Sequence, residues 1–560
     1  MSFYSDASLV MIPSGYKTSK VYSAVPTDGT GDLAFTRSNA TATRVASNGL
    51  IEKVRTNLVL QSETFGNASW GKSLVTITDN FDTAPNGTLT ADRFVSAGGA
   101  FPQISQARTV VSGTQYTASL YVKSDGTTQI AQVIIIGGNT VSFTPTSTWQ
   151  RISTTFTAAS SSATFVLATN SAIAPASSFV IWAAQLETGD IATDYIPTTT
   201  AAVSVGPVAN VPRLDYLNST CPKLLLEPQR TNLALFSESF DNAAWTKGGT
   251  TISANTSATL DPSGYNGSDK LVEDSSTGVH RVFNNSSVVV SDSVATTYSV
   301  FAKAAERTQI YLRDNDIVGA RFNLSTGAVI STEGTATATI TKYGNGWYRC
   351  TITRVNSNTS GRVIVYLDNG GDSYTGNGTS GVYIFGAQIE SSAAYATSYI
   401  PTLGASVTRG ADAASKTGIS SLIGQTEGTL FVEMNNVQEL DIPEITLDDN
   451  TNDNRIVLTR SAVNGFWGIF TASAGTGASG YGTTAGNSGK FALAYSSAGY
   501  VLYRNGVQVA TATASLPVSL SAVRLNGRST SDFLSTKSIA QTLLFKTRLT
   551  NAQLAELTTI

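Results

Sequence analysis

Charge is scarce in this chain. Only 13% of its 560 residues are charged, about half the ~25% share of an ordinary soluble domain. The 36 Lys and Arg nearly balance the 39 Asp and Glu, which gives a formal net charge of -3. Nucleic acids and anionic membranes are recognised through a basic patch or excess, and this chain has neither. We therefore expect no nucleic-acid partner. The 41% hydrophobic content argues against disorder, which combines low hydrophobicity with high net charge.

Histidine and cysteine are almost absent. One histidine, His280, excludes a His-rich metal site, and two cysteines, Cys221 and Cys350, exclude a four-thiolate zinc site and a disulfide framework. His280 has no nucleophile motif such as G-x-S-x-G around it, so we interpret it as a surface or internally hydrogen-bonded residue. We interpret the cysteines as separate reduced thiols. The sequence predicts no catalytic residue and no enzyme, and the metal ligands, if any, are unknown.

Export signals and membrane spans are also missing. Residues 1–17 lack a basic stretch followed by an apolar one, so they do not form a signal peptide. The apolar run at residues 133–136 ends at Gly137, far short of a membrane span. A surface rich in Ser, Thr, Asn and Gly is typical of extracellular β proteins, yet nothing exports this one. We hypothesise a protein assembled in a host cytoplasm and released by lysis, as a bacteriophage virion component is.

What the chain does contain is a long internal repeat. Five segments of its first half recur in the second: RTNL at 55–58 and 230–233, SETF at 62–65 as SESF at 237–240, NASW at 67–70 as NAAW at 242–245, AQLE at 184–187 as AQIE at 387–390, and ATDYIPT at 192–198 as ATSYIPT at 396–402. The two copies are domain-sized.

Each copy shows the pattern of β structure. Trp182, Ala184 and Leu186 alternate onto one face of an expected strand, and Asn-Gly dipeptides, the strongest short hairpin signal, occur nine times in the chain. The one good helix signal is a capping box that starts at Thr550. The sequence therefore predicts an all-β, multi-domain chain of tandem β-sandwich (jelly-roll) domains.

The repeat also sets the expected domain boundaries. We predict an N-terminal anchoring or docking segment at 1–55, with a hairpin that turns at Asn48-Gly49. A first sandwich at 56–205, a connector at 206–229 and a second sandwich at 230–409 follow. The third sandwich is expected at 416–560. The first segment is too short for a core of its own, so we expect it to dock on a neighbouring domain or subunit.

Several motifs resemble fibre and spike proteins of tailed bacteriophages, of the head-spike-fibre or tail-fibre type, and the opening resembles virion proteins of crAss-like phages. These motifs are ATRV at 42–45, NGLIE at 48–52, NVPR at 210–213, LEPQRTN at 226–232 and the repeated YIPT. The repeats resemble jelly-roll carbohydrate-binding modules, and the last unit resembles laminin-G or concanavalin-type sandwiches. The resemblance implies a virion location, a homotrimer, and partners among capsid, portal or tail proteins.

Tryptophans are the first candidates for sugar contact, because sugars stack on flat aromatic faces. Four residues are candidate glycan contacts: Trp467, Phe466, Trp70 and Trp245. Trp70 and Trp245 are repeat equivalents, which favours buried packing as the alternative interpretation. Trp149 and Trp347 are also repeat equivalents, and we assign them to the framework.

Acidic residues raise the question of structural calcium, which needs six to eight oxygen ligands. One acidic stretch offers such oxygens, at Asp441, Asp448, Asp449, Asn450, Asn452 and Asp453, but it lacks EF-hand spacing, and a solvated loop is the alternative. Glu187 and Glu390 either bind calcium or accept hydrogen bonds from the turn that follows them. We favour the hydrogen bonds and expect no other cofactor.

These observations predict a virion structural protein, a head fibre or else a tail fibre, that adheres to host-surface glycans. Two alternatives from other classes stay open. One is a purely architectural decoration or collar protein that binds other virion chains. The other is a polysaccharide depolymerase, because the separation of two catalytic carboxylates cannot be read from a sequence.

Overall fold

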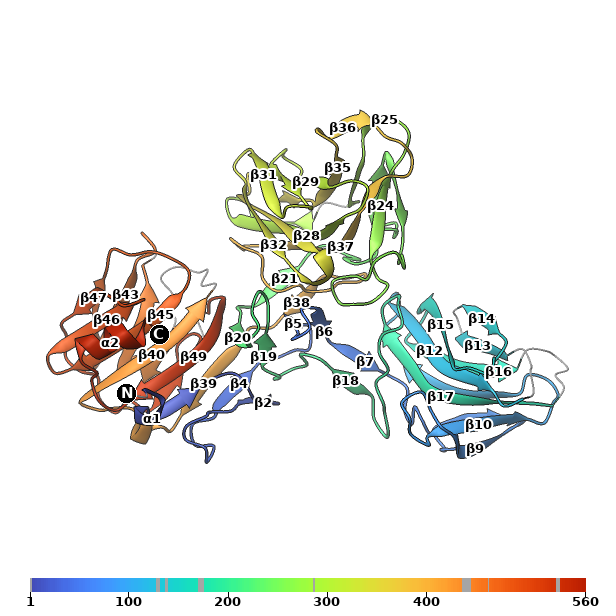
Figure 1. Ribbon diagram of the computed structural model, residues 1–560, viewed down its shortest axis with the longest axis horizontal. Helices are drawn as coiled ribbons and strands as arrows, with labels where there is room; N and C mark the ends of the chain where they lie inside the picture. The colour runs from blue at the N-terminus through green and yellow to red at the C-terminus, as the bar shows by residue number, and fades with distance from the viewer. Residues whose placement is uncertain are drawn as a thin grey trace.

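The computed structural model is a three-lobed, all-β molecule whose lobes meet at a central hub (Figure 1). It describes residues 3–126, 131–135, 139–169, 176–285, 288–435, 445–461, 463–529 and 534–559. Each lobe is a sandwich of two antiparallel sheets, so the predicted fold class is confirmed. No helix in the described part of the chain is long and apolar enough to cross a membrane.

The first sandwich consists of two five-stranded sheets whose inner faces bury one apolar core. One sheet has the order β15-β12-β17-β10-β9 and the other β14-β13-β16-β11-β8. Their bounds are β8 Gly71–Ser73, β9 Val75–Asp82, β10 Ala91–Ser96, β11 Gln103–Thr109, β12 Gln115–Ser124, β13 Ala131–Ile135, β14 Thr140–Phe143, β15 Gln150–Thr157, β16 Ser162–Thr169 and β17 Ser177–Thr188.

The second sandwich repeats this plan with two six-stranded sheets, ordered β22-β26-β35-β29-β30-β31 and β23-β24-β37-β28-β33-β32. Their bounds are β22 Trp245–Gly248, β23 Thr250–Ser253, β24 Asp269–Glu273, β26 Arg281–Asn284, β28 Ala295–Ala304, β29 Gln309–Arg313, β30 Gly319–Asn323, β31 Ala328–Glu333, β32 Thr337–Lys342, β33 Tyr348–Val355, β35 Ile364–Asp368 and β37 Gly381–Ser391. Two short pairs, β25 (Thr277–Val279) with β36 (Ser373–Thr375) and β27 (Val288–Val289) with β34 (Ser360–Gly361), flank it.

Repeat-equivalent residues make the same contacts in both sandwiches. Trp70 Nε1 donates to the Gln61 carbonyl at 3.1 Å, and Trp245 Nε1 donates to the Phe236 carbonyl at 3.0 Å. The central pairs β12·β17 and β28·β37 carry a bulge at the same place, after Ser119 and Ser299. The sequence repeat is therefore a structural duplication.

The third sandwich takes strands from both ends of the chain. Its sheets have the orders β19-β20-β49-β40-β45-β46-β47, with β1 also on β49, and β2-β3-β4-β39-β48-β41-β42-β43-β44. Their bounds are β1 Leu9–Met11, β2 Tyr16–Lys17, β3 Lys20–Val21, β4 Leu33–Thr36, β19 Arg213–Asp215, β20 Lys223–Leu226, β39 Ala413–Thr417, β40 Glu427–Asn435, β41 Ile445–Asp448, β42 Arg455–Arg460, β43 Trp467–Ser473, β44 Thr476–Tyr481, β45 Gly489–Ser496, β46 Gly499–Arg504, β47 Val507–Ala512, β48 Ala522–Arg524 and β49 Lys537–Phe545. Strands of the N-terminal segment and of the connector thus belong to the same sheets as residues of the expected 416–560 unit.

Two helices pack on this lobe, α1 (Phe3–Asp6) and α2 (Asn551–Leu557). The predicted capping box at the start of α2 is confirmed, with Thr550 as the N-cap and Gln553 at N3. Asn505-Gly506, one of the nine Asn-Gly dipeptides, forms a hairpin as that signal predicts, because β46 and β47 pair across it.

The hub joins the lobes through short strand pairs. The N-terminal hairpin consists of β5 (Thr43–Val45) and β6 (Ile51–Lys53), as the sequence predicts. Two further pairs tie the start and end of each duplicated sandwich together: β7 (Arg55–Asn57) with β18 (Val203–Val205), and β21 (Arg230–Asn232) with β38 (Val407–Arg409).

Buried ion pairs hold the hub. Arg213 contacts both Glu227, at 2.6 Å, and Asp412. Arg37 lies 3.0 Å from Asp412, and Arg409 lies 2.9 Å from Glu227. All five side chains are at most 2% exposed. These charges come from the N-terminal segment, the connector and the end of the second sandwich, so the pairing fixes all three against one another.

Candidate functional site

An aromatic cluster lies on the outer face of the β12–β15–β17 sheet in the first sandwich. The ring of Trp182 lies 5.4 Å from that of Tyr121 and 5.0 Å from that of Tyr195. Trp149, just before β15, is the fourth ring of the cluster. Trp182 is buried, whereas Tyr121, Trp149 and Tyr195 are half-buried. These three residues are therefore partly open to solvent.

Charged side chains border these rings. Arg151 lies over Tyr121 at 5.4 Å and donates to Ser119 Oγ at 3.1 Å. Lys123 lies over Trp149 at 5.1 Å and pairs with Asp82 at 2.5 Å. Cations held over ring faces order the rings and add polar groups beside them. The face thus combines flat apolar surface with hydrogen-bonding groups.

The equivalent face of the second sandwich is covered. Its cluster is formed by Phe301, Trp347, Phe385 and Tyr399, all buried, and it includes Ile51 from the β6 strand of the N-terminal hairpin. Lys53 follows on the same hairpin, lies 5.3 Å over the Phe385 ring and pairs with Glu238 at 2.8 Å.

Among the described residues, no such cover lies on the first sandwich. Within the described ranges, its aromatic cluster contains only residues 84–195 of that sandwich. The duplication thus gives one face sealed by a hairpin and one that is partly open. The half-exposure of Trp149, against the full burial of its equivalent Trp347, follows from this difference.

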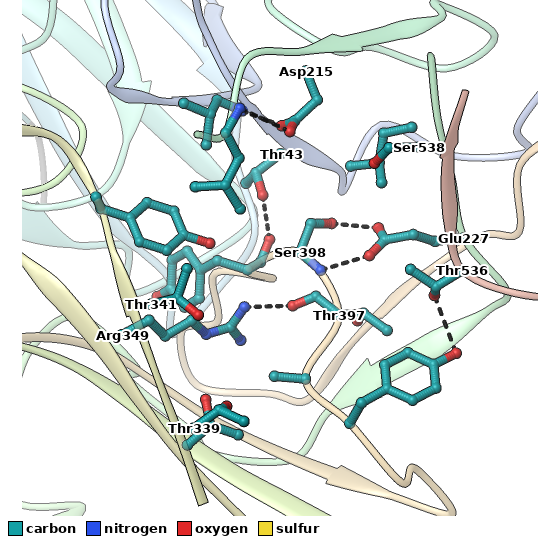
Figure 2. Close-up of a pocket in the computed structure, with 18 of the residues that line it drawn as sticks. Thr43, Asp215, Glu227, Thr339, Thr341, Arg349, Thr397, Ser398, Thr536 and Ser538 are labelled. Atoms are coloured by element: carbon teal, nitrogen blue, oxygen red, sulfur yellow. Dashed lines mark hydrogen bonds between the residues drawn. The ribbon is translucent and has the colours of Figure 1, made fainter. Parts of the chain in front are cut away.

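A cavity lies at the hub, apart from the aromatic face of the first sandwich (Figure 2). It is a cavity of about 420 Å³ between the β32–β33 face of the second sandwich, the N-terminal hairpin, the connector and β49. Figure 2 shows Glu227 accepting from Ser398, and Arg349 donating to the Thr397 carbonyl, at its edge. Burial raises the pKa of Asp215, also in the lining, although it accepts hydrogen bonds from two backbone amides.

The four predicted glycan contacts lie elsewhere. Trp70 and Trp245 fill the cores of the duplicated sandwiches, and Trp467 fills the core of the third. Each has its indole N–H bonded to a backbone carbonyl. Their ring faces pack against protein, because a large apolar side chain contributes most when it fills a core. Phe466 is half-buried beside a turn.

The structure separates Trp149 from its repeat equivalent. The match with Trp347 predicts a framework role for Trp149, yet Trp149 is half-buried and Trp347 is fully buried. The sequence carries no signal that a hairpin covers only one of the two faces. The threonines of β32 did carry a signal. Thr337, Thr339 and Thr341 alternate with Ala338 and Ile340, which predicts a hydroxyl-bearing strand face.

The remaining candidates have structural partners. His280 is buried, with Nδ1 2.7 Å from the Gly249 carbonyl and Nε2 3.2 Å from the Tyr374 carbonyl. Cys221 and Cys350 are free thiols, as predicted, and burial raises the pKa of Cys350.

The two glutamates accept hydrogen bonds from the following turn, which confirms the favoured interpretation. The Thr193 amide donates to Glu187 at 2.9 Å, and the Thr397 amide donates to Glu390 at 3.1 Å. In the acidic stretch, Asp448 pairs with Arg524 at 2.6 Å, and Asp441 lies outside the described residues. Among the residues that the structure describes, no group of three or more His, Cys, Asp or Glu is placed to hold a metal ion.

Comparisons with known proteins give resemblances to solved structures alone. No family model and no curated protein matches the chain. The Ruminococcus gnavus IT-sialidase CBM40 bound to α2,3 sialyllactose is 18% identical over 25% of this chain and 86% of its own, with a TM-score of 0.22. The tandem CBM22-1-CBM22-2 domain of Paenibacillus barcinonensis Xyn10C is 15% identical over 60% of this chain and 97% of its own, with a TM-score of 0.22.

Proposed function

We propose that the chain is a non-catalytic structural component of a bacteriophage virion, a head fibre in the first place and a tail fibre in the second, that adheres to host-surface glycans. The observation that supports adhesion is the partly open aromatic face of the first sandwich. The repeated motifs that resemble phage fibre proteins support the virion role. Other virion proteins are its proposed anchors, and a homotrimer is its proposed assembly.

The chemistry of the face suits a sugar ring. The apolar side of a pyranose stacks on aromatic rings such as Trp149 and Tyr121, and its hydroxyls take hydrogen bonds from Arg151 and Lys123 at the border. A shallow face gives weak single-site affinity. Many copies on one particle raise the overall affinity by effective concentration.

A glycan array tests this function on the full chain. We expect binding to host-surface glycans, and we expect Trp149→Ala to weaken it at least tenfold, since a stacking ring is lost. Phe466→Ala is the matched control, a half-buried aromatic on the third sandwich, and it should bind as the parent does. Weakening by Phe466→Ala alone would move the site to the third sandwich.

The architectural alternative has its own supporting observation, the hairpin that covers the equivalent face in the second sandwich. If no glycan binds, cross-linking within intact virions should join the Trp149 face to another virion protein. Labelling the chain in virion images would test its place on the particle. Host polysaccharide incubated with the chain should keep its length, and shortening would favour the depolymerase.

A further inference from the structure

The hub cavity has one wall of hydroxyl groups. The wall is the outer face of β32 and β33, where Thr337 pairs with Thr353, Thr339 with Thr351, and Thr341 with Arg349. Figure 2 shows Thr339 and Thr341 beside Arg349 on this side of the cavity. Their strand neighbours Ala338 and Ile340 pack toward the core instead. The pleat of the sheet therefore directs the threonines to the cavity.

The hydroxyls of the wall differ in whether they are already hydrogen-bonded. Thr353 Oγ1 lies 2.8 Å from Thr297 Oγ1, and Thr337 donates to the Thr353 carbonyl at 3.4 Å. By contrast, the hydroxyls of Thr339, Thr341 and Thr351 have no hydrogen-bond partner in the described part of the chain. Each hydroxyl supplies one donor and two acceptor positions. The wall therefore offers several adjacent groups that both donate and accept.

Among the described residues, the four charged groups that line the cavity already have protein partners. Arg349 donates to the Thr397 carbonyl and to Ser299 Oγ, and Arg44 pairs with Glu52 at 2.7 Å.

Glu227 and Asp215, the two acidic groups, are engaged as well. Glu227 takes hydrogen bonds from Ser398 and pairs with two arginines, while Asp215 accepts from the amides of Val45 and Leu217. A charged ligand would lose its hydration here and find no free opposite charge among the described lining residues, which is costly.

We propose that this cavity binds a neutral sugar or a similar uncharged polyol. A ligand with several adjacent hydroxyls matches the threonine wall, and Tyr343 and Tyr395 in the lining offer ring surface for its C–H groups. The volume of about 420 Å³ lies within the roughly 300–1,000 Å³ of small-molecule sites. This site is separate from the aromatic face of the first sandwich, and the proposal does not depend on the function proposed above.

The test titrates neutral mono- and disaccharides, with sialic acid and glucuronic acid as charged probes, against the full chain by ligand-observed NMR. We expect at least one neutral sugar to bind and the charged probes not to bind in the cavity. The double variant Thr339→Val, Thr351→Val should weaken the binding about tenfold, since two hydroxyl partners are lost. Valine keeps the shape and the strand preference of threonine.

Two controls separate the sites. Thr155→Val changes a threonine on the equivalent strand of the first sandwich, β15, and should leave the neutral-sugar binding unchanged. Because Trp149 belongs to the glycan-binding face proposed above, the titration is repeated in Trp149→Ala, where Thr339→Val with Thr351→Val should still weaken the remaining neutral-sugar binding about tenfold. The proposal is overturned if no neutral sugar binds, if the double variant weakens the binding of a charged sugar more than that of any neutral sugar, or if the double variant keeps both the parent melting temperature and the parent affinity for neutral sugars.

Discussion

At the scale of single residues, Glu227 shows how the hub uses buried charge. It accepts from the Ser398 amide at 2.7 Å and from Ser398 Oγ at 2.6 Å, and it pairs with Arg213 and Arg409. Burial alone would raise the pKa of this carboxyl. The two arginines and the Ser398 hydrogen bonds outweigh burial and lower the pKa from 4.5 to about 2. The folded hub therefore favours the ionised form.

This lowered pKa predicts acid sensitivity. Between pH ~4.5 and ~2 the unfolded chain binds a proton at Glu227 and the folded chain does not. The contribution of Glu227 to stability is therefore complete above pH ~4.5 and is lost as the pH drops toward 2. The loss from this group amounts to roughly 3 kcal/mol. Glu227→Gln should lose stability at neutral pH, by about 3–5 kcal/mol, because it removes the carboxylate that pairs with buried Arg409 and one of the two that pair with buried Arg213. Its remaining acid dependence should be flatter than that of the parent.

Urea unfolding at neutral pH and near pH 3 measures both effects. An unchanged acid dependence in Glu227→Gln would contradict the assignment of the titration to Glu227.

At the scale of elements, the N-terminal hairpin depends on its neighbours. Its strands β5 and β6 have three residues each, too few to be stable alone. The Val45 amide donates to Asp215 at 2.7 Å, and the Ile51 amide donates to the Pro262 carbonyl at 2.8 Å. Ile51 itself packs among Phe301, Trp347 and Phe385. The hairpin is therefore a clamp between connector and second sandwich.

Truncation of Ile51 tests the clamp. Ile51→Ala should destabilise the second sandwich and its hairpin by about 2–4 kcal/mol, because it leaves a gap in an aromatic cluster. We expect this destabilisation to appear as faster hydrogen exchange of the β5 and β6 amides. Ile12→Ala removes the same atoms from an exposed position and should change little. Equal effects of the two variants would contradict the packing role of Ile51.

Local patterns in the sequence predict individual elements well, but they predict poorly which distant segments pack against those elements. The hairpin at Asn48-Gly49, the capping box at Thr550 and the duplicated Trp70 and Trp245 environments depend on residues close together in the chain, so their signals are local. The cover of Ile51 on Phe385 joins residues more than 300 positions apart. Such a contact leaves no periodic signal, and the open face at Trp149 could not be predicted for the same reason.

At the scale of the whole molecule, the third sandwich is built from the two ends of the chain and the connector. Leu9 pairs with Leu544, Ala34 with Ser415, and Leu225 with Ser538. The core of this lobe includes Leu9, Met11 and Phe35 together with residues beyond 414. The first sandwich differs, because both of its sheets lie within residues 71–188.

This contrast predicts how fragments behave. Residues 416–560 alone should not fold, because they lack the strands β1–β4, β19 and β20 and expose the core that those strands cover. Residues 56–205, the matched control, should fold as a cooperative monomer. Circular dichroism and thermal melting of the two fragments measure the difference. A cooperative, monomeric 416–560 fragment would contradict the interleaved assembly.

Because the third sandwich pairs strands from distant parts of the chain, its sheets can form only after the later strands have been synthesised. Strand β1 is synthesised more than 500 residues before its partner β49, because Leu9 pairs with Leu544. At about 5–20 residues per second, the first strands wait on the order of half a minute to two minutes for that partner. The two duplicated sandwiches can close during this interval. Strand β1 remains without its sheet partner until β49 has been made, so a chaperone that shields it is expected to raise the yield of intact chains.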